Sequence, residues 1–199
     1  QGIDGLFGFY IGADEKDSKN NLLTIMQGGL TLGQKDYYLD QDPATQAIRK
    51  AYTDYIVGLT QHAGWSEASA RGIAADVMRI ETRLAKASKG MVELRDPEGN
   101  YNKLSYDELL KQFPGIDWDD YFSIFGIKKG DVKEVNVGQP DAIHEAEKIW
   151  EEETPSALWN LYLWHAIDGV ASYIDDEARA LNFAFYGTAM SGTPEDRPH

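Results

Sequence analysis

The stretch of sequence that decides the fold runs from Ser66 to Gly90 and reads SEASARGIAADVMRIETRLAKASKG. Its apolar residues recur three and four positions apart, which is the spacing of one helix face. This stripe consists of Ile73, Val77, Ile80 and Leu84. Ser66 can cap the first turn and Gly90 can end the last. The stretch therefore predicts a long amphipathic helix whose stripe faces a core.

The same reasoning predicts helices on both sides of this stretch. Upstream, apolar residues recur at helical spacing between Pro43 and Gly64, and the proline suits a first turn. Downstream, Ser105 and Glu108 have the spacing of a capping box ahead of a short helix. Further helices are predicted over residues 118–125, 141–153, 155–171 and 174–186. The chain is therefore expected to be mainly α.

Two β-prone runs precede the helices. Residues 6–11 and 22–26 are rich in aromatic and branched side chains, and the polar residues 14–21 between them are typical of a turn. These runs predict an N-terminal β-hairpin. Residues 132–137 alternate as an edge strand does. The predicted fold is thus a helical domain with an N-terminal β-hairpin and at most one short extra strand.

The composition excludes several classes of function. The 199 residues include 19 Lys and Arg against 33 Asp and Glu, which gives a formal net charge of -14. That charge repels phosphate backbones, so nucleic acid is not expected as a partner. The chain has no cysteine, which rules out disulfides, thiol catalysis and thiolate zinc sites. No apolar run is long enough for a membrane span.

The histidines do not complete a catalytic motif. A zinc hydrolase of the gluzincin type needs two histidines four residues apart on a helix, with a glutamate directly after the first. The run from His144 to Lys148 reads HEAEK, so a lysine stands where the second imidazole is needed. His165 lies among apolar residues and is expected to be a core histidine. We therefore expect no catalytic residue, no metal ligand and no cofactor in this chain.

Two alternatives remain open from the residues alone. The five Trp and eleven Tyr could line a groove for a peptide or a glycan, which would make the chain a free-standing helical binding module. Carboxylate clusters at residues 119–120, 151–153 and 175–177 could supply a glycosidase pair. No spacing among these clusters favours that second alternative.

Several short motifs resemble those of a known peptidase family. Residues 13–18 read ADEKDS, residues 27–32 read QGGLTL and residues 35–39 read KDYYL. In this order they are similar to the ADxKNS, QxGLxLP and RDYYL segments of neprilysin-family and PepO-like zinc metallopeptidases. Residues 93–97 (ELRDP) and 101–105 (YNKLS) continue the resemblance. It reaches the end of the chain, and the departures are Asp17, Gly33 and Lys35 for the family's usual Asn, Pro and Arg.

The resemblance implies that the chain is part of a large two-domain enzyme. In that family a catalytic lobe carries HExxH and a downstream ExxxD glutamate, and a helical lobe covers the cavity. The sequence contains neither motif, so the resemblance implies the N-terminal, helical, non-catalytic segment, a cap that controls the access of peptides. Zinc and proteolysis are then expected in the full-length parent. The expected partners are the missing catalytic lobe of the same polypeptide and peptide substrates.

The residues that match the family's motifs are expected to have structural roles, as hairpin and turn partners. They are Asp14, Lys16, Gln27, Gly29, Leu30, Asp36, Tyr37, Tyr38, Arg95, Asp96, Pro97, Asn102, Lys103, Gln139, Pro140, Phe183, Tyr186 and Gly187. Because the family's metal motifs do not occur here, the resemblance gives no catalytic or zinc-binding residue.

The expected organisation has three parts. Residues 1–40 form the hairpin and a connecting loop at the base, residues 41–190 form the helical lobe, and residues 191–199 form a linker toward the missing catalytic lobe. An apolar face is expected where that lobe would sit. His199 is either a substitution for a family residue or the first residue of a purification tag.

The sequence also gives an expected location. The chain opens at Gln1 without a basic and apolar leader, so a signal peptide and further domains are expected outside this sequence. The lack of cysteine fits a bacterial protein. We therefore expect an extracytoplasmic parent that is periplasmic, secreted or lipid-anchored at the cell surface.

Overall fold

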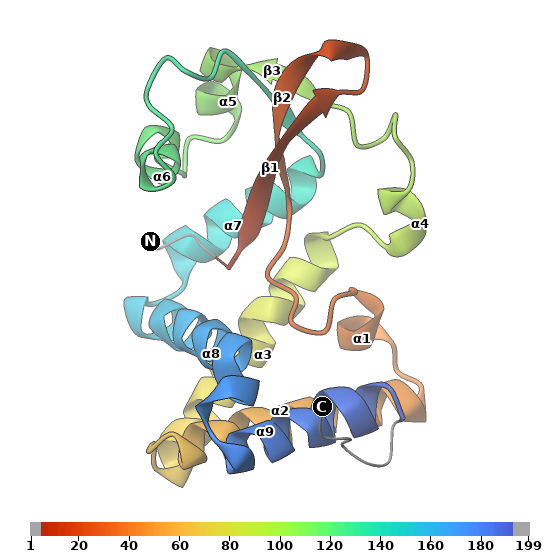
Figure 1. Cartoon of the computed structure of the whole chain (residues 1–199), viewed down its shortest axis with the longest axis vertical. Helices are drawn as coiled ribbons and strands as arrows, with labels where there is room; N and C mark the ends of the chain where they lie inside the picture. Colours follow the sequence, from red (N-terminus) through yellow and green to blue (C-terminus); the bar gives the residue numbers. More distant parts are fainter. Residues whose placement is uncertain (1–4, 193–199) are drawn as a thin grey trace. The chain divides into compact units, whose positions relative to one another are not determined.

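The computed structural model describes residues 5–192, which are mainly helical, as predicted (Figure 1). They form two compact units. Residues up to 30 together with 83–153 form the first, here called the sheet unit, and residues 31–82 together with those from 154 onward form the second, the helical unit. The boundary expected near residue 40 does not coincide with the boundary between these units. Most of the predicted linker, including His199, lies outside the described residues.

The sheet unit contains the predicted hairpin. Strand β1 (Phe7–Asp14) pairs antiparallel with β2 (Asp17–Gln27). The predicted turn over residues 14–21 is too long, because the ladder continues past an irregularity between Ala13 and Asp14 to a final pair, Asp14–Asp17. The polar residues 17–21 are all exposed. They can therefore belong to the strand without the burial of a polar side chain, which hides the strand from a hydrophobicity pattern.

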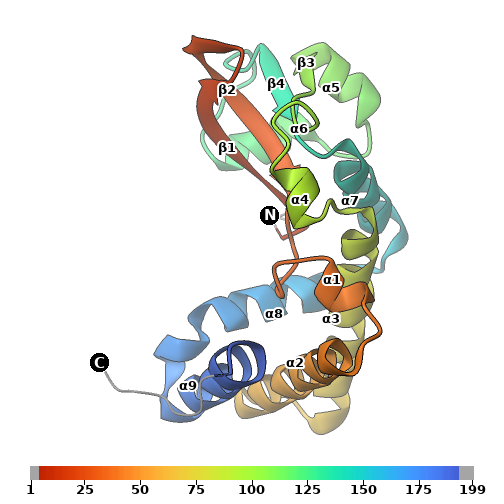
Figure 2. The same cartoon turned by 90° about the vertical axis from the view of Figure 1, so that its right-hand side faces the viewer.

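Two strands extend the hairpin into a sheet of order β1-β2-β4-β3, with β4 between β2 and β3 (Figure 2). Strand β4 (Glu134–Val137) pairs in parallel with β2 and antiparallel with β3 (Lys103–Ser105). The edge-strand prediction is therefore wrong, since β4 is interior and both of its valines are fully buried. The prediction of at most one extra strand missed β3, because three residues carry no alternation and depend on pairing with β4.

Helices and aromatic side chains complete the sheet unit. Its helices are α4 (Met91–Leu94), α5 (Tyr106–Gln112), α6 (Trp118–Ile124) and α7 (Pro140–Glu152). The ring of Phe7 in β1 lies 5.5 Å from that of Trp118 and 5.0 Å from that of Tyr121, centroid to centroid. These contacts pack α6 onto β1. The predicted capping box is present: the backbone N–H of Glu108 donates to Ser105 Oγ, and that of Ser105 donates to Glu108 Oε1.

The helical unit is built from α1 (Asp36–Leu39), α2 (Pro43–His62), most of α3 (Glu67–Ala87), α8 (Pro155–Ile174) and α9 (Asp176–Asn182). The helix predicted over residues 174–186 begins later, at Asp176, because Asp175 is extended and separates it from α8. It continues as a π-helix over Phe183–Met190. A Cβ on Gly187 would lie 2.5 Å from the ring of Phe183. The two family-motif residues therefore fit together only because one has no side chain. None of the helices in residues 5–192 combines the length and apolar character needed to cross a bilayer.

Glu81 lies at the centre of the helical unit and is fully buried. Its carboxylate accepts hydrogen bonds from Thr31 N at 3.2 Å, Thr31 Oγ1 at 3.0 Å and Tyr38 Oη at 3.0 Å. Tyr52 Oη donates to it at 2.8 Å and accepts from Trp164 Nε1 at 3.0 Å. A buried carboxylate is tolerated only when donors replace its water. The loop before α1, α1 itself and α2 are therefore all attached to one residue of α3.

We expect the substitution Glu81→Ala to lower the free energy of unfolding by about 3–5 kcal/mol, since it leaves buried hydroxyl and amide groups without their acceptor. Urea unfolding followed by circular dichroism measures this. The control is Asp54→Ala, which removes an exposed ion pair with Lys50 at 3.0 Å and should cost no more than about 1 kcal/mol. Equal effects of the two substitutions would contradict the central role of Glu81.

Candidate functional site

Asp14 is the centre of a charged cluster at the turn end of the hairpin, where β1 ends and β2 begins. Asp14 is only 2% exposed. Its carboxylate accepts three hydrogen bonds, from Lys103 Nζ at 2.8 Å, Tyr101 Oη at 2.9 Å and the backbone N–H of Lys16 at 3.0 Å. Lys103 also contacts Glu134 Oε2 at 3.0 Å. The hydrogen bond from Lys103, followed by that from the Lys16 backbone, lowers the pKa of Asp14 to about 2. This cluster ties β1 to β3 and β4.

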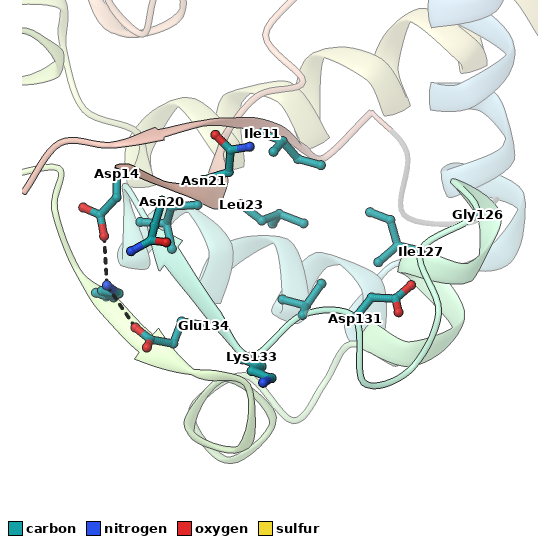
Figure 3. A pocket seen from close by; sticks show the side chains of 13 residues that line it. Ile11, Asp14, Asn20, Asn21, Leu23, Gly126, Ile127, Asp131, Lys133 and Glu134 are labelled. Carbon is teal, nitrogen blue, oxygen red and sulfur yellow. Dashed lines mark hydrogen bonds and ion pairs between the residues drawn. The ribbon is translucent and has the colours of Figure 1, made fainter. Parts of the chain in front are cut away.

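A pocket of about 610 Å³ opens beside this cluster, and we call it the hairpin pocket. Figure 3 shows the contacts of Asp14 and Glu134 at one end and the apolar side chains of Ile11 and Ile127 toward the other. The lining residues are Ile11, Asp14, Asn20, Asn21, Leu22, Leu23, Lys103, Gly126, Ile127, Asp131, Val132, Lys133 and Glu134. Neither histidine nor cysteine is among them. The pocket therefore offers both apolar and polar groups to a ligand.

Amide side chains of the family motifs join segments of the sheet unit. The backbone N–H of Gln27 donates to Gln139 Oε1 at 2.8 Å, and the side chain of Gln27 exchanges two hydrogen bonds with the backbone of Lys89. Gln139 Nε2 donates to Asn100 Oδ1 at 3.0 Å. Asn102 Nδ2 donates to a backbone carbonyl of β4. In these contacts, hydrogen bonds within the protein take the place of hydrogen bonds to water.

The Arg95-Asp96-Pro97 motif forms the turn after α4. Arg95 is the C-cap residue of α4, and Asp96 Oδ1 accepts from the backbone N–H of Glu98 at 3.1 Å. Asn100 Nδ2 donates to the carbonyl of Asp96 at 2.7 Å. Pro140 occupies the first turn of α7, where its missing N–H costs nothing.

Gly29 and Leu30 precede α1. Gly29 has a φ of 77°, and a Cβ there would lie 2.1 Å from the carbonyl oxygen of Gly5, so only glycine fits. Leu30 is half-buried in the following loop.

The remaining motif residues belong to the helical unit. Asp36 begins α1, and the carbonyl of Tyr37 accepts from Arg49 Nη1 at 2.8 Å. Tyr38 is one of the donors to Glu81 described above. Tyr186 Oη donates to Asp168 Oδ2 at 2.7 Å. Burial raises the pKa of Asp168 and outweighs the opposing effect of its tyrosine donors.

The incomplete zinc-like run on α7 faces a second pocket of about 640 Å³ in the sheet unit. Glu147 is 7% exposed, and its Oε2 accepts from the backbone N–H of Gly115 at 2.7 Å. Its Oε1 has no hydrogen-bond partner and lies 3.4 Å from His144 Nδ1. Glu145 is held by Arg83 at 3.0 Å. In the described part of the chain, no group of three or more His, Cys, Asp or Glu is arranged to hold a metal ion.

The aromatic residues pack mainly into the cores of the two units. Phe7, Trp118, Tyr121 and Phe122 cluster in the sheet unit, and Tyr52, Tyr55, Trp164 and Phe185 cluster in the helical unit. Neither of the two pockets described above is lined by an aromatic side chain. The rings of these two clusters therefore contribute to core packing.

Comparison with known proteins decides the family. The model of peptidase family M13 matches residues 1–199, the whole chain. The chain belongs to peptidase family M13. An endothelin-converting enzyme homolog of Locusta migratoria is 29% identical over 205 residues, covering 96% of this chain and 28% of that protein. Neprilysin-3 of Drosophila melanogaster is 28% identical over 183 residues, covering 87% of this chain and 23% of that protein.

Two solved structures share the fold. The zinc metalloprotease Zmp1 of Mycobacterium tuberculosis, in complex with an inhibitor, is 26% identical with a TM-score of 0.91, covering 100% of this chain and 30% of that chain. PepO from Lactobacillus rhamnosis is 18% identical with a TM-score of 0.77, covering 96% of this chain and 30% of that chain. This M13 segment thus spans less than a third of the relatives that it matches, and the resemblance to a neprilysin-like zinc metallopeptidase is confirmed.

Two important residues of the structure escaped the sequence reasoning, although each had a signal. Glu81 lies four residues after Val77 and three before Leu84, so a carboxylate occupies the apolar stripe of a helix. Glu147 likewise lies four residues after Ile143 and three before Trp150. An acidic residue at a core-facing position indicates a buried polar network.

The substitution Asp14→Asn should destabilise the chain at neutral pH and matter less in acid. The pKa of Asp14 is lowered in the folded state, so its contribution to stability is present above pH ~4 and is lost as the pH falls toward about 2. Urea unfolding at pH 7 and at pH 2.5 measures the difference between the two proteins. Glu15→Gln, at an exposed neighbouring position, is the control. A difference that stays constant with pH would contradict the assignment.

Glu147→Gln is expected to have the opposite effect on stability. Burial raises the pKa of Glu147 in the folded state. The ionised carboxylate therefore destabilises the fold once the pH rises above the ordinary pKa of a glutamate. A glutamine keeps an acceptor for Gly115 and places an N–H near His144. The variant should unfold at higher urea concentration than the wild type at pH 7.5, with the gain lost near pH 4. Glu151→Gln, exposed on the same helix, should show a smaller gain, and equal gains would contradict the proposal.

Proposed function

We propose that this chain is a substrate-access cap of a zinc-dependent metalloendopeptidase and supplies no catalytic residue itself. In this proposal the full-length parent hydrolyses peptides with a zinc ion held by a catalytic lobe outside this sequence. The observation that carries the proposal is the match to peptidase family M13 over the whole chain. Two facts support it: the chain spans less than a third of its relatives, and its nearest approach to HExxH ends in Lys148.

A cap acts by limiting which molecules reach the metal. A flexible peptide can pass a restricted entrance, whereas a folded protein that contains the same cleavage sequence cannot. Such a role requires a rigid body more than reactive groups. The saturated carboxylates Glu81 and Asp14, each with donors from separate segments, are features suited to rigidity.

The proposed partner is the catalytic lobe of the same polypeptide. Large apolar side chains that a lone domain would bury are exposed: Trp159 is 66% exposed, Tyr173 is 87% exposed and Val92 is 83% exposed. Contact with another protein surface would remove such apolar side chains from water. We also propose an extracytoplasmic location and a bacterial source, with support from the absence of cysteine and from the bacterial origin of Zmp1 and PepO.

The 199-residue chain should bind zinc no more tightly than a generic acidic protein and should not cleave peptides. The reason is that it cannot pair two imidazoles on one helix face. Calorimetric titration with zinc and a fluorogenic peptide assay test this, with a longer protein that includes an HExxH segment as the positive control. Stoichiometric tight binding or turnover by the chain alone would overturn the proposal.

Access control has its own test in that longer protein. It should cleave a short flexible peptide and leave a folded protein that carries the same cleavage sequence in a stable helix intact. Cleavage of both at equal rates would contradict the cap role while leaving the family assignment unaffected.

A further inference from the structure

The hairpin pocket lies where β2 and the segment before β4 part from each other. The parallel ladder between β2 and β4 covers only three pairs, from Leu23–Val135 to Ile25–Val137. At the start of that ladder, the consecutive residues 20–23 on one side and 131–134 on the other line the pocket. Successive side chains of a strand point to opposite faces of the sheet. A pocket that touches four in a row therefore runs along the edge of β2.

The backbone of β2 offers hydrogen-bonding groups to this pocket. The N–H of Gly138 donates to the carbonyl of Ile25 at 2.9 Å, so the polar groups of Ile25 point toward β4. Because the direction alternates along a strand, Leu23 and Asn21 point their N–H and C=O groups to the same side. Leu23 is paired with Val135, but Asn21 lies beyond the ladder and has no strand partner there. Its N–H and C=O are available to an added strand.

The side chains of the pocket set the character of that added strand. Ile11 is 60% exposed and lies on the same face of the hairpin as its cross-strand partner Leu23. With Ile127 they form an apolar end that can take one branched side chain. Among the charged residues that line the pocket, the three carboxylates Asp14, Asp131 and Glu134 outnumber the two lysines. Together with the net charge of -14, this favours a cationic ligand.

We propose that the hairpin pocket binds an extended peptide, which adds to the edge of β2 through the backbone of Asn21. The peptide would place an apolar side chain against Ile11 and Ile127 and a basic residue toward Glu134. Backbone recognition of this kind depends little on sequence, which suits a protein that meets many peptides. The inference rests on the proposed function for the origin of the ligand, a peptide substrate bound away from the site of cleavage.

The test uses the zinc-free 199-residue chain, so it does not depend on hydrolysis. The probe is the blocked hexapeptide acetyl-Ala-Arg-Val-Ile-Val-Ala-amide, titrated into ¹⁵N-labelled chain. Amide shifts should change at residues 20–23 and 131–134. Asn21→Pro removes the N–H that faces the pocket and leaves the pairing with β1 intact, and it should weaken binding at least about threefold, the effect of losing one hydrogen bond. Asn21→Ala, which keeps the N–H, should bind as the wild type does.

Two further measurements keep the proposal falsifiable if Asn21→Pro does not fold. A peptide N-methylated at alternate residues should lose binding to the wild type, and Ile11→Asn, at an exposed position, should weaken binding of the apolar peptide. Shifts confined to other surfaces, or equal binding by the proline and alanine variants, would overturn the proposal. In a longer, active protein, Asn21→Pro should raise KM for this peptide and leave kcat unchanged. Absence of hydrolysis there would count against the proposed function alone.

Discussion

A carboxylate removed from water must be supplied with donors, and the helical unit is arranged around this requirement at Glu81. The donors come from Thr31, Tyr38 and Tyr52, which belong to a loop and to two different helices. Trp164 donates to Tyr52 and so connects α8 to the same centre. One residue of α3 thus fixes the positions of segments that lie far apart in the sequence. Glu81 also gives a physical reason for Tyr38, the second tyrosine of the KDYYL motif, because the Tyr38 hydroxyl donates to the Glu81 carboxylate.

The sheet unit contains two buried carboxylates, Asp14 and Glu147, which differ in how many donors they have. Asp14 receives three donors and keeps its negative charge at low pH. Glu147 receives one donor for its two oxygens, and burial shifts its pKa upward. The number of donors therefore separates a carboxylate that stabilises the fold from one that opposes it at neutral pH. Asp14 lines the hairpin pocket and Glu147 lines the second pocket. The two pockets therefore differ in the pH at which their buried carboxylate becomes neutral.

The sequence predicted the elements whose signal is local and missed those that depend on distant partners. The stripe of α3, the prolines that open α2 and α8, and the Ser105–Glu108 capping box are local and are present. Strand β3 and the interior position of β4 depend on pairing between residues about 30 apart, which no periodicity reveals. The hairpin pocket was missed for a related reason, because it exists only where a ladder between distant strands stops. The motif residues were predicted from resemblance, and their contacts became visible only in three dimensions.

The interleaved order of the two units has a consequence for how a ribosome delivers this chain. The sheet unit is complete once residue 153 has been made, whereas the helical unit must wait for α8 and α9 before α2 can cover its apolar side. During that interval, residues 31–82 are tethered to a finished neighbour while their own partners are still being synthesised. Vectorial folding of this kind exposes hydrophobic surface for seconds. Until α8 and α9 have been made, the apolar side of α2 is therefore a surface to which a chaperone can bind.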